Sequence, residues 1–168
     1  MSPTEPSDNR LLAAMPPEVQ TRLFPHLQLT NLALGQVIAE SGSPLTDIYF
    51  PVDAIISLLY VMETGASAEI SMIGNEGLFG VSVFMGGEST TSRAVVQCSG
   101  TAYRLPGYRL KDEFGRHGAA LDILLRYTQS LIAQMSQTAV CNRHHTLNNN
   151  SVVGCCCRST GCPARGWT

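Results

Sequence analysis

The sequence predicts a mainly β domain with flanking helices, built as a sandwich or barrel of short strands. Short β-rich runs recur at intervals of about eight to twelve residues between positions 34 and 105. A helical pattern precedes these runs, and a long stretch with apolar residues three and four apart follows them. With 168 residues, the chain has room for one core of roughly 100 to 150 residues and an appendage.

The composition is typical of a globular protein. Hydrophobic residues make up 44% of the chain, charged residues make up 14%, and the formal net charge is -2. These values exclude the disordered class and indicate no basic surface of the kind that binds nucleic acids. The polar, acidic N-terminus MSPTEPSDNR is not a secretory signal, and no apolar run reaches the roughly 18 residues of a membrane span. We therefore expect a cytoplasmic protein.

The elements follow in a simple order. Residues 9–29 predict short helices, the second of which is opened by Pro16 and Pro17. In the run AIISLLYV, residues 54–61, both faces are largely apolar, as expected for a strand that is covered on both sides. Pro106 closes the β region, and YRLKDEF predicts a brief amphipathic helix after it.

A long helix is expected from about residue 119 to about residue 147, with a length on the order of 40 Å. Side chains three and four residues apart form a stripe along it. The stripe contains Leu121, Leu124, Leu125, Thr128, Leu131, Ile132 and Met135. Such a stripe packs either on its own barrel or on the same helix of a second subunit. Because the stripe is long enough to overrun a small barrel, we expect a homodimer joined through this helix.

A glycine-rich loop, IGNEGLFGVSVFMGGESTTSRAVVQ (residues 73–97), connects two predicted strands. Its small residues would let backbone amides approach an anion, and a short helix beginning near Glu76 or Gly77 would point its N-terminus at one. Arg93 would then clamp a phosphate. In the alternative, the glycines only shape turns and Arg93 only pairs with a carboxylate, Glu69, Glu76 or Glu88.

The order of these elements resembles the effector domain of the Crp/Fnr family of bacterial transcription factors, which includes the cyclic-AMP receptor and the fumarate/nitrate regulator. Short helices, a β region with GNEGLFG and SRAVVQ, and a long striped helix ending in CNRHH carry the resemblance over residues 9–145. It implies a cyclic-nucleotide-binding-like β-roll, or jelly roll, at residues 9–118 and a dimerisation helix at residues 119–147. It also implies a helix-turn-helix DNA-binding domain after that helix.

The resemblance also suggests an effector site. In nucleotide-binding members a Gly-Glu pair holds the ribose, and an Arg-Ser or Arg-Ala pair holds the cyclic phosphate. Here the glycine and the Arg-Ala pair match, but an asparagine stands at the ribose position and the glutamate comes one place late. The candidate effector-binding residues are Gly74, Asn75, Glu76, Gly77, Arg93 and Ala94. A cyclic nucleotide is thus one candidate effector, but the departures from the family's nucleotide-binding motif do not support it.

No metal and no catalytic site are expected. The side chains of His144 and His145 would point about 100° apart on a helix, so they do not easily close on one ion. The sequence has no Ser-His-Asp order, paired-carboxylate motif or P-loop, and residues 34–105 contain no histidine. We therefore expect a regulatory protein, or alternatively a stand-alone module that binds a small ligand or another protein, and not an enzyme.

The tail NNNSVVGCCCRSTGCPARGWT, residues 148–168, fits neither a zinc site nor a disulfide framework. Allowed codons for the residues from 147 onward, read in a shifted frame, give EQQQRRWLLLSLDRLPGKGL, which has the pattern of a helix. We therefore expect that loss of one base near residue 147 put the tail out of frame. On this interpretation the tail is disordered, the DNA-binding domain is missing, and the chain itself does not bind specific DNA.

Overall fold

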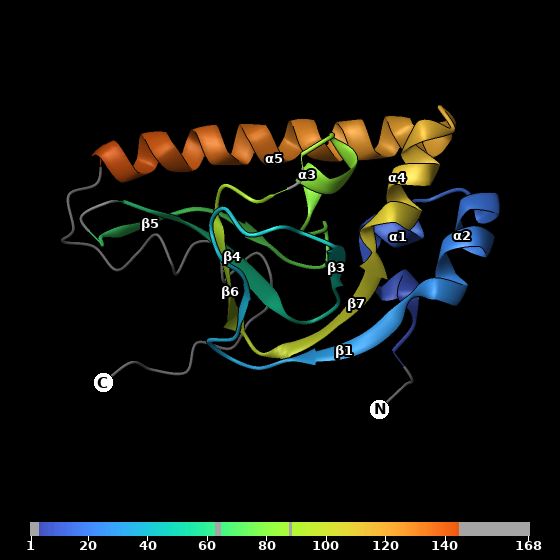
Figure 1. The fold of residues 1–168 in the computed structure, drawn as a ribbon, viewed down its shortest axis with the longest axis horizontal. Coiled ribbons are helices and arrows are strands. Elements are labelled where there is room, and N and C mark those ends of the chain that lie inside the picture. The colour runs from blue at the N-terminus through green and yellow to red at the C-terminus, as the bar shows by residue number, and fades with distance from the viewer. Residues whose placement is uncertain (1–3, 63–64, 88, 145–168) are drawn as a thin grey trace.

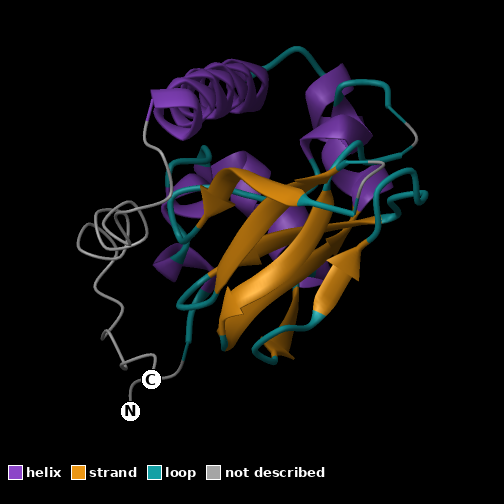
Figure 2. Ribbon diagram, turned by 90° about the vertical axis from the view of Figure 1, so that its left-hand side faces the viewer, coloured by secondary structure: helices purple, strands orange, loops and turns teal. Residues whose placement is uncertain are grey.

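The computed structural model describes residues 4–62, 65–87 and 89–144. The expectations for residues 148–168 and for His145 lie outside this part of the chain. Within it, two antiparallel sheets face each other and helices cover their ends, as Figures 1 and 2 show. The predicted fold class, a β-roll with flanking helices and a long C-terminal helix, is confirmed.

The three-stranded sheet has the order β1-β7-β3, and the four-stranded sheet has the order β2-β6-β4-β5. The strands of the first sheet are β1 (Gln28–Leu32), β3 (Asp47–Pro51) and β7 (Gly100–Pro106). The strands of the second are β2 (Val37–Ala39), β4 (Ile55–Val61), β5 (Ser67–Ile73) and β6 (Arg93–Cys98). The β region starts earlier than the sequence suggested, because residues 28–32 pair with β7 and the helical lead-in ends at His26.

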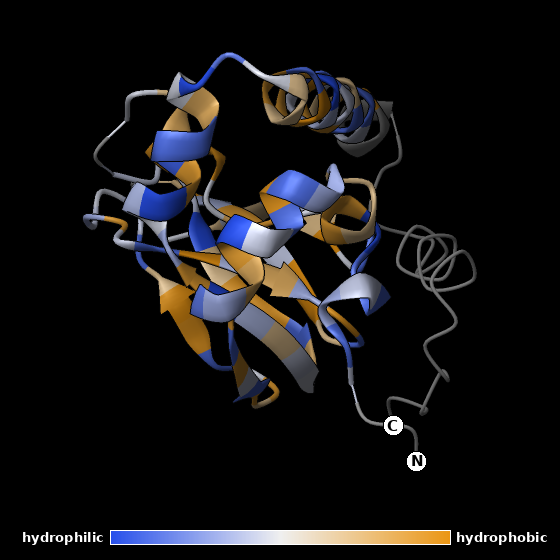
Figure 3. Cartoon of the chain, turned by 90° about the vertical axis from the view of Figure 1, so that its right-hand side faces the viewer, coloured by the Kyte–Doolittle hydropathy of each residue, from blue (hydrophilic) through white to orange (hydrophobic). Residues whose placement is uncertain are grey.

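The helices cluster at one end of the roll and along one side of it. At the N-terminal end are η1 (Pro6–Asp8), α1 (Arg10–Ala13), α2 (Pro17–Leu23) and η2 (Phe24–His26). The later helices are α3 (Val81–Phe84), α4 (Gly107–Gly115) and α5 (Ala119–His144). In Figure 3 the strands are largely orange, whereas the surrounding helices carry blue, hydrophilic stretches.

Two apolar clusters hold these elements together. The first joins the three-stranded sheet to the helices and includes Leu12, Phe50, Leu105, Leu110 and Leu124. The second fills the roll and includes Ile56, Leu58, Ile73, Phe79 and Val96. Since Leu124 of α5 belongs to the first cluster and Met135 packs against the second, α5 is fixed to both.

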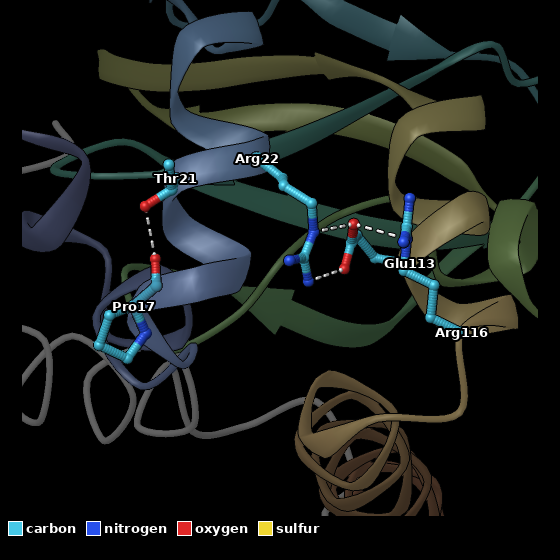
Figure 4. A network of polar contacts seen from close by, with 5 residues as sticks. All are labelled: Pro17, Thr21, Arg22, Glu113 and Arg116. Carbon is cyan, nitrogen blue, oxygen red and sulfur yellow. Dashed lines mark hydrogen bonds and ion pairs between the residues drawn. The ribbon is translucent and has the colours of Figure 1, made fainter.

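A buried carboxylate ties α2 to α4, as Figure 4 shows. Arg22 donates from Nε and Nη2 to the two oxygens of Glu113, at 2.6 and 2.8 Å. Arg116 lies 3.1 Å from the same carboxylate. The hydrogen bonds from Arg22 are the main cause that lowers the pKa of Glu113, and burial opposes them. The ion pair therefore fixes the helical lead-in to the end of the roll.

The predicted stripe on α5 divides into two faces. Leu124, Thr128 and Leu131 are buried against the domain itself, whereas Leu125 and Ile132 are exposed. Met135 is half-buried against the roll. Figure 1 shows α5 starting above α4 and running over the roll towards β5. Self-packing, the alternative to pairing with a second subunit, thus accounts for one face of the helix and leaves the other open.

Candidate functional site

A cavity of about 230 Å³ lies between the β-roll and α5. Its lid comes from α5, with Thr128, Leu131, Ile132 and Met135. Its floor and walls come from the roll, from Leu58, Ile73 and residues 78–82, and from the segment 89–92 that leads into β6. We call this space the α5 cavity. Because helix and roll both line it, a bound molecule would contact two separate elements at once.

The walls of the α5 cavity are of two kinds. Apolar side chains that belong to the second core cluster or pack against it form its inner part, among them Leu58, Ile73, Phe79 and Met135. Hydroxyl groups line other parts of the wall. They belong to Ser82, Ser89, Thr90, Thr91, Ser92 and Thr128. Among the cavity-lining residues that the structure describes, none carries a charge.

Two of these hydroxyls are already oriented by the backbone. Thr90 Oγ1 donates to the carbonyl oxygen of Ser92 at 3.0 Å and accepts from the Ser92 amide at 3.3 Å. Thr128 Oγ1 donates to the carbonyl oxygen of Leu124 at 2.8 Å. A hydroxyl has one donor and two acceptor lone pairs. Thr128 therefore presents lone pairs that a donor group on a ligand could use.

Arg93 does not line the cavity. Successive residues of a strand point to opposite faces of the sheet. Arg93, the first residue of β6, pairs with Leu59 and is half-exposed. Ala94 pairs with Leu58, which lines the cavity, and is buried in the core of the roll. The Nε atom of Arg93 lies 3.3 Å from Glu40 Oε2, as an ion pair without the alignment of a hydrogen bond. The guanidinium group thus pairs with a carboxylate, as the alternative interpretation expected, although the partner is a different glutamate.

The turn at residues 74–77 is closed by the rest of the protein. The Gly74 amide donates to Glu76 Oε1 at 3.0 Å, and the Gly77 amide donates to the Gly74 carbonyl at 3.3 Å. A Cβ atom added at Gly77 would lie 2.4 Å from the ring of Tyr127, which fills the space beside it. The structure therefore does not bring Gly74, Asn75, Glu76 and Gly77 together with Arg93 and Ala94 around one cavity.

The expected helix near Glu76 is absent from this turn. Phe79 instead forms an isolated β-bridge with Tyr49, and the helix α3 begins only at Val81. Gly80 precedes it at φ +115°, a backbone conformation that favours glycine. The glycine-rich pattern therefore marks a turn and a strand-like crossing, and not a helix start at Glu76.

Tyr127 of α5 and Asn9 of the lead-in hold this turn, and neither was a predicted site residue. The Tyr127 hydroxyl donates to the Leu78 carbonyl at 2.8 Å, and burial raises the pKa of that hydroxyl. Asn9 donates from Nδ2 to the carbonyls of Pro51 and Gly77, at 2.8 and 2.9 Å. The asparagine before a helix is a sequence signal for an N-cap. Its contacts with two distant segments have no signal in the sequence.

A second, larger cavity of about 310 Å³ lies at α2 and α4, beside the ion pair of Figure 4. Arg22, His26, Arg109, Glu113 and Arg116 line it. Arg22 and Arg116 both form ion pairs with Glu113, so this space lies beside charged groups that already hold the fold together. The α5 cavity is the better candidate site because apolar core residues line it and two elements, the roll and α5, form its sides.

Two further observations concern the part of the chain that the structure describes. No three His, Cys, Asp or Glu side chains in it lie close enough together to hold a metal ion. None of its helices combines the length and the apolar character that a membrane crossing needs.

Residues 29–117, more than half of the chain, match the family described as Cyclic nucleotide-binding domain. The chain belongs to this family. The matched region runs from β1 into the residues after α4, so the cyclic nucleotide-binding domain includes the roll but not α5. No curated protein matches the chain in sequence. The match confirms the domain family that the resemblance implied. It does not test the expectation about a DNA-binding domain.

Solved structures share the fold. A regulatory subunit of a cAMP-independent protein kinase A from Trypanosoma brucei has a TM-score of 0.62 and 15% identity, covering 73% of this chain and 44% of its own. The N-terminal domain of a transcriptional regulator from Streptomyces coelicolor has a TM-score of 0.57 and 16% identity, covering 88% and 100%. DNR from Pseudomonas aeruginosa has a TM-score of 0.61 and 14% identity, covering 80% and 63%.

The neighbours thus include Crp/Fnr-type regulators as well as a kinase subunit. At these identities the likeness concerns the fold. The chain spans less than half of the length of the trypanosome protein that it matches.

Proposed function

We propose that residues 4–144 form the effector-sensing and dimerisation part of a Crp/Fnr-type transcription regulator. The observation that carries the proposal is that one helix, α5, covers the α5 cavity with one face and exposes apolar residues on the other. A ligand in the cavity would contact the helix directly. In a dimer joined through the exposed face, a shift of that helix would reach the second subunit.

The outer face of α5 supports the dimer. Leu125, Ile132 and Val140 are 44%, 52% and 59% exposed, and they stand seven and eight residues apart. Apolar residues at this spacing lie on one side of a helix, and coiled-coil seams use the same spacing. Their apolar area is best removed from water by a second copy of the helix, because a two-fold axis places the same residues opposite each other.

Ile132 links the two faces. Its side chain lines the α5 cavity and is also half-exposed on the outer face. On the helical wheel it stands between the buried Thr128 and the exposed Leu125. A ligand that displaced Ile132 would therefore change the surface on which a second subunit packs, which is how an effector could be sensed.

Sedimentation velocity on the full chain tests the proposal. The wild type should sediment as a dimer at micromolar concentrations, and Leu125→Glu should weaken the dimer by more than about tenfold, because it places a charge in the apolar seam. Ser130→Glu is the matched control, since Ser130 is exposed on the polar side of the same helix. A wild type that stays monomeric, or equal effects of the two substitutions, would refute the dimer.

A further inference from the structure

The family to which the chain belongs is described by the binding of cyclic nucleotides, which carry one negative charge on the phosphate. A buried anion needs an opposite charge or several aligned donors, because water no longer solvates it. The fit of such a ligand to the α5 cavity can be judged from the side chains around it.

The described walls of the α5 cavity supply no cation. Hydroxyl groups are their only polar side chains, and they occur beside a larger apolar surface. Of these, Thr90 and Thr128 already donate their proton to backbone carbonyls, so they can only accept from a ligand. Acceptors oriented in this way disfavour a phosphate group, whose oxygens are themselves acceptors.

A change of side-chain rotamer alone cannot bring the positive charge of Arg93 into the cavity. Its Cα lies on β6 with the side chain on the face opposite to Ala94, and it pairs with Leu59 and not with the cavity-lining Leu58. A shift of β6 by one residue would turn Arg93 inward, but it would also move Ala94 and Val96 out of the core. The register of β6 is fixed by pairing with both β2 and β4. The guanidinium group therefore remains beside Glu40, outside the cavity.

The glycine turn supplies no substitute. The amides of Gly74 and Gly77 donate within the turn, and Tyr127 fills the space beside Gly77. None of residues 74–77 lines the cavity. A basic side chain is therefore missing from the described walls, and the amides of the 74–77 turn do not reach them.

We propose that the α5 cavity binds a small, uncharged, mainly apolar ligand with one or two hydrogen-bonding groups, and not a cyclic nucleotide. The proposal rests on the proposed function, in which this cavity is the effector site. Its volume of about 230 Å³ lies below the roughly 300–1,000 Å³ of pockets for drug-sized molecules, so a single ring with a few substituents suits it. A donor group on the ring would meet the lone pairs of Thr128, and the ring would pack against Leu58, Phe79 and Met135.

Thermal unfolding of the full chain with matched probes tests this. One probe is p-cresol, which is uncharged at pH 7 because phenols have a pKa of about 10, and the others are p-tolyl phosphate and cyclic AMP. At millimolar concentrations p-cresol should raise the Tm by at least about 2 °C, whereas the two phosphates should leave it unchanged. A shift with either phosphate equal to that with p-cresol would overturn the proposal and leave the effector role standing. No shift with any probe would overturn both, while the dimer measurement would remain independent.

Substitutions locate the binding. Met135→Trp should fill the cavity and abolish the shift with p-cresol, whereas Ser136→Trp, on the exposed side of the next position, should keep it. Equal responses of the two variants would place p-cresol elsewhere and overturn the proposal.

A gain of charge selectivity gives a second test. Ser92→Arg should place a guanidinium group at the cavity wall and create a shift with p-tolyl phosphate, and Arg93→Ala should leave the shift with p-cresol unchanged. Thr91→Arg, at an exposed lining position, serves if Ser92→Arg does not fold. Loss of p-cresol binding in Arg93→Ala would show that Arg93 contacts the ligand and would overturn the assignment.

Discussion

The hydroxyl of Tyr127 on α5 donates a 2.8 Å hydrogen bond to the carbonyl oxygen of Leu78. The ring of Tyr127 also covers Gly77, where a Cβ atom would meet it at 2.4 Å. One aromatic side chain therefore fixes α5 to the glycine turn and leaves no room for any other residue than glycine at that point.

Gly77→Ala should destabilise the domain by more than about 2 kcal/mol, because the buried Tyr127 ring cannot move aside without losing its hydrogen bond. Urea unfolding followed by circular dichroism measures the free energy of unfolding. Gly115→Ala is the control, since no atom lies within 4 Å of a Cβ atom there and the residue ends a helix. The control should be neutral or slightly stabilising. Equal destabilisation by both would contradict the role of Tyr127.

Asn9→Asp should destabilise the domain by about 2 kcal/mol or more. Asp is as good an N-cap as Asn, so the bonds that Oδ1 accepts from the amides of Leu11 and Leu12 survive. The two bonds that Nδ2 donates to Pro51 and Gly77 are lost, and a carboxylate then faces two carbonyl oxygens in a buried site. Chemical unfolding tests this. A variant as stable as the wild type would show that Asn9 acts only as a helix cap.

The contribution of Glu113 should depend on pH. Its pKa is lowered in the folded state, so its stabilising effect is present above the unfolded pKa of about 4.3 and is lost as pH falls through the folded pKa. Glu113→Gln should therefore cost about 1.5–3 kcal/mol near pH 7, and the difference from the wild type should shrink below about pH 4.

The exposed pair of Arg104 and Asp47 gives the comparison for Glu113. Asp47→Asn should change the free energy of unfolding by about 0.2–1 kcal/mol at pH 7, because solvent screens this pair. Unfolding curves for the wild type and both variants between pH 3 and pH 7 are needed, a range of roughly one unit below and three above the unfolded pKa. A cost of Glu113→Gln that stays constant down to pH 3 would argue against an ionised Glu113 in the clamp.

Gln134 should control how firmly the second half of α5 is held. It accepts a 2.9 Å hydrogen bond from the buried Ser71 hydroxyl, and it donates to the Met72 carbonyl at 3.3 Å. Gln134→Ala should cost about 1 kcal/mol and should increase amide hydrogen exchange in α5 beyond residue 131 more than before it. Gln129→Ala, at an exposed position of the same helix, should leave the exchange pattern unchanged. A uniform rise along α5 would mean that Gln134 does not anchor that half.

The fold could be predicted because periodicity reports burial. The apolar run AIISLLYV predicted a strand covered on both sides. Ile55, Ile56 and Leu58 of β4 are indeed buried, whereas Tyr60 and Val61 at its end are exposed. The long helix could be predicted from its repeating apolar positions. The division of its stripe into two faces also has a signal in the sequence, since the neighbours Leu124 and Leu125 point about 100° apart and cannot both face one partner.

The candidate site could be predicted only in part. The sequence pointed to the glycine loop and the residues before β6, and the segment 89–92 does line the cavity. Whether Ser92 or Arg93 faces inward depends on the register of β6, and a loop of this length leaves that register undetermined in the sequence. The contacts of Asn9 with Pro51 and Gly77 join segments far apart in the chain, so they follow from the tertiary structure alone.

The alternation at Ser92 and Arg93 also bears on how such a domain can diverge. The guanidinium group of Arg93 lies one residue away from Ser92, which lines a cavity wall without a charge. The same backbone would carry a guanidinium group at either position. A single substitution at Ser92 would then change the class of ligand that the cavity binds, and the fold would stay the same. Related proteins with this fold could therefore change the effector they respond to and keep the helix that transmits its binding.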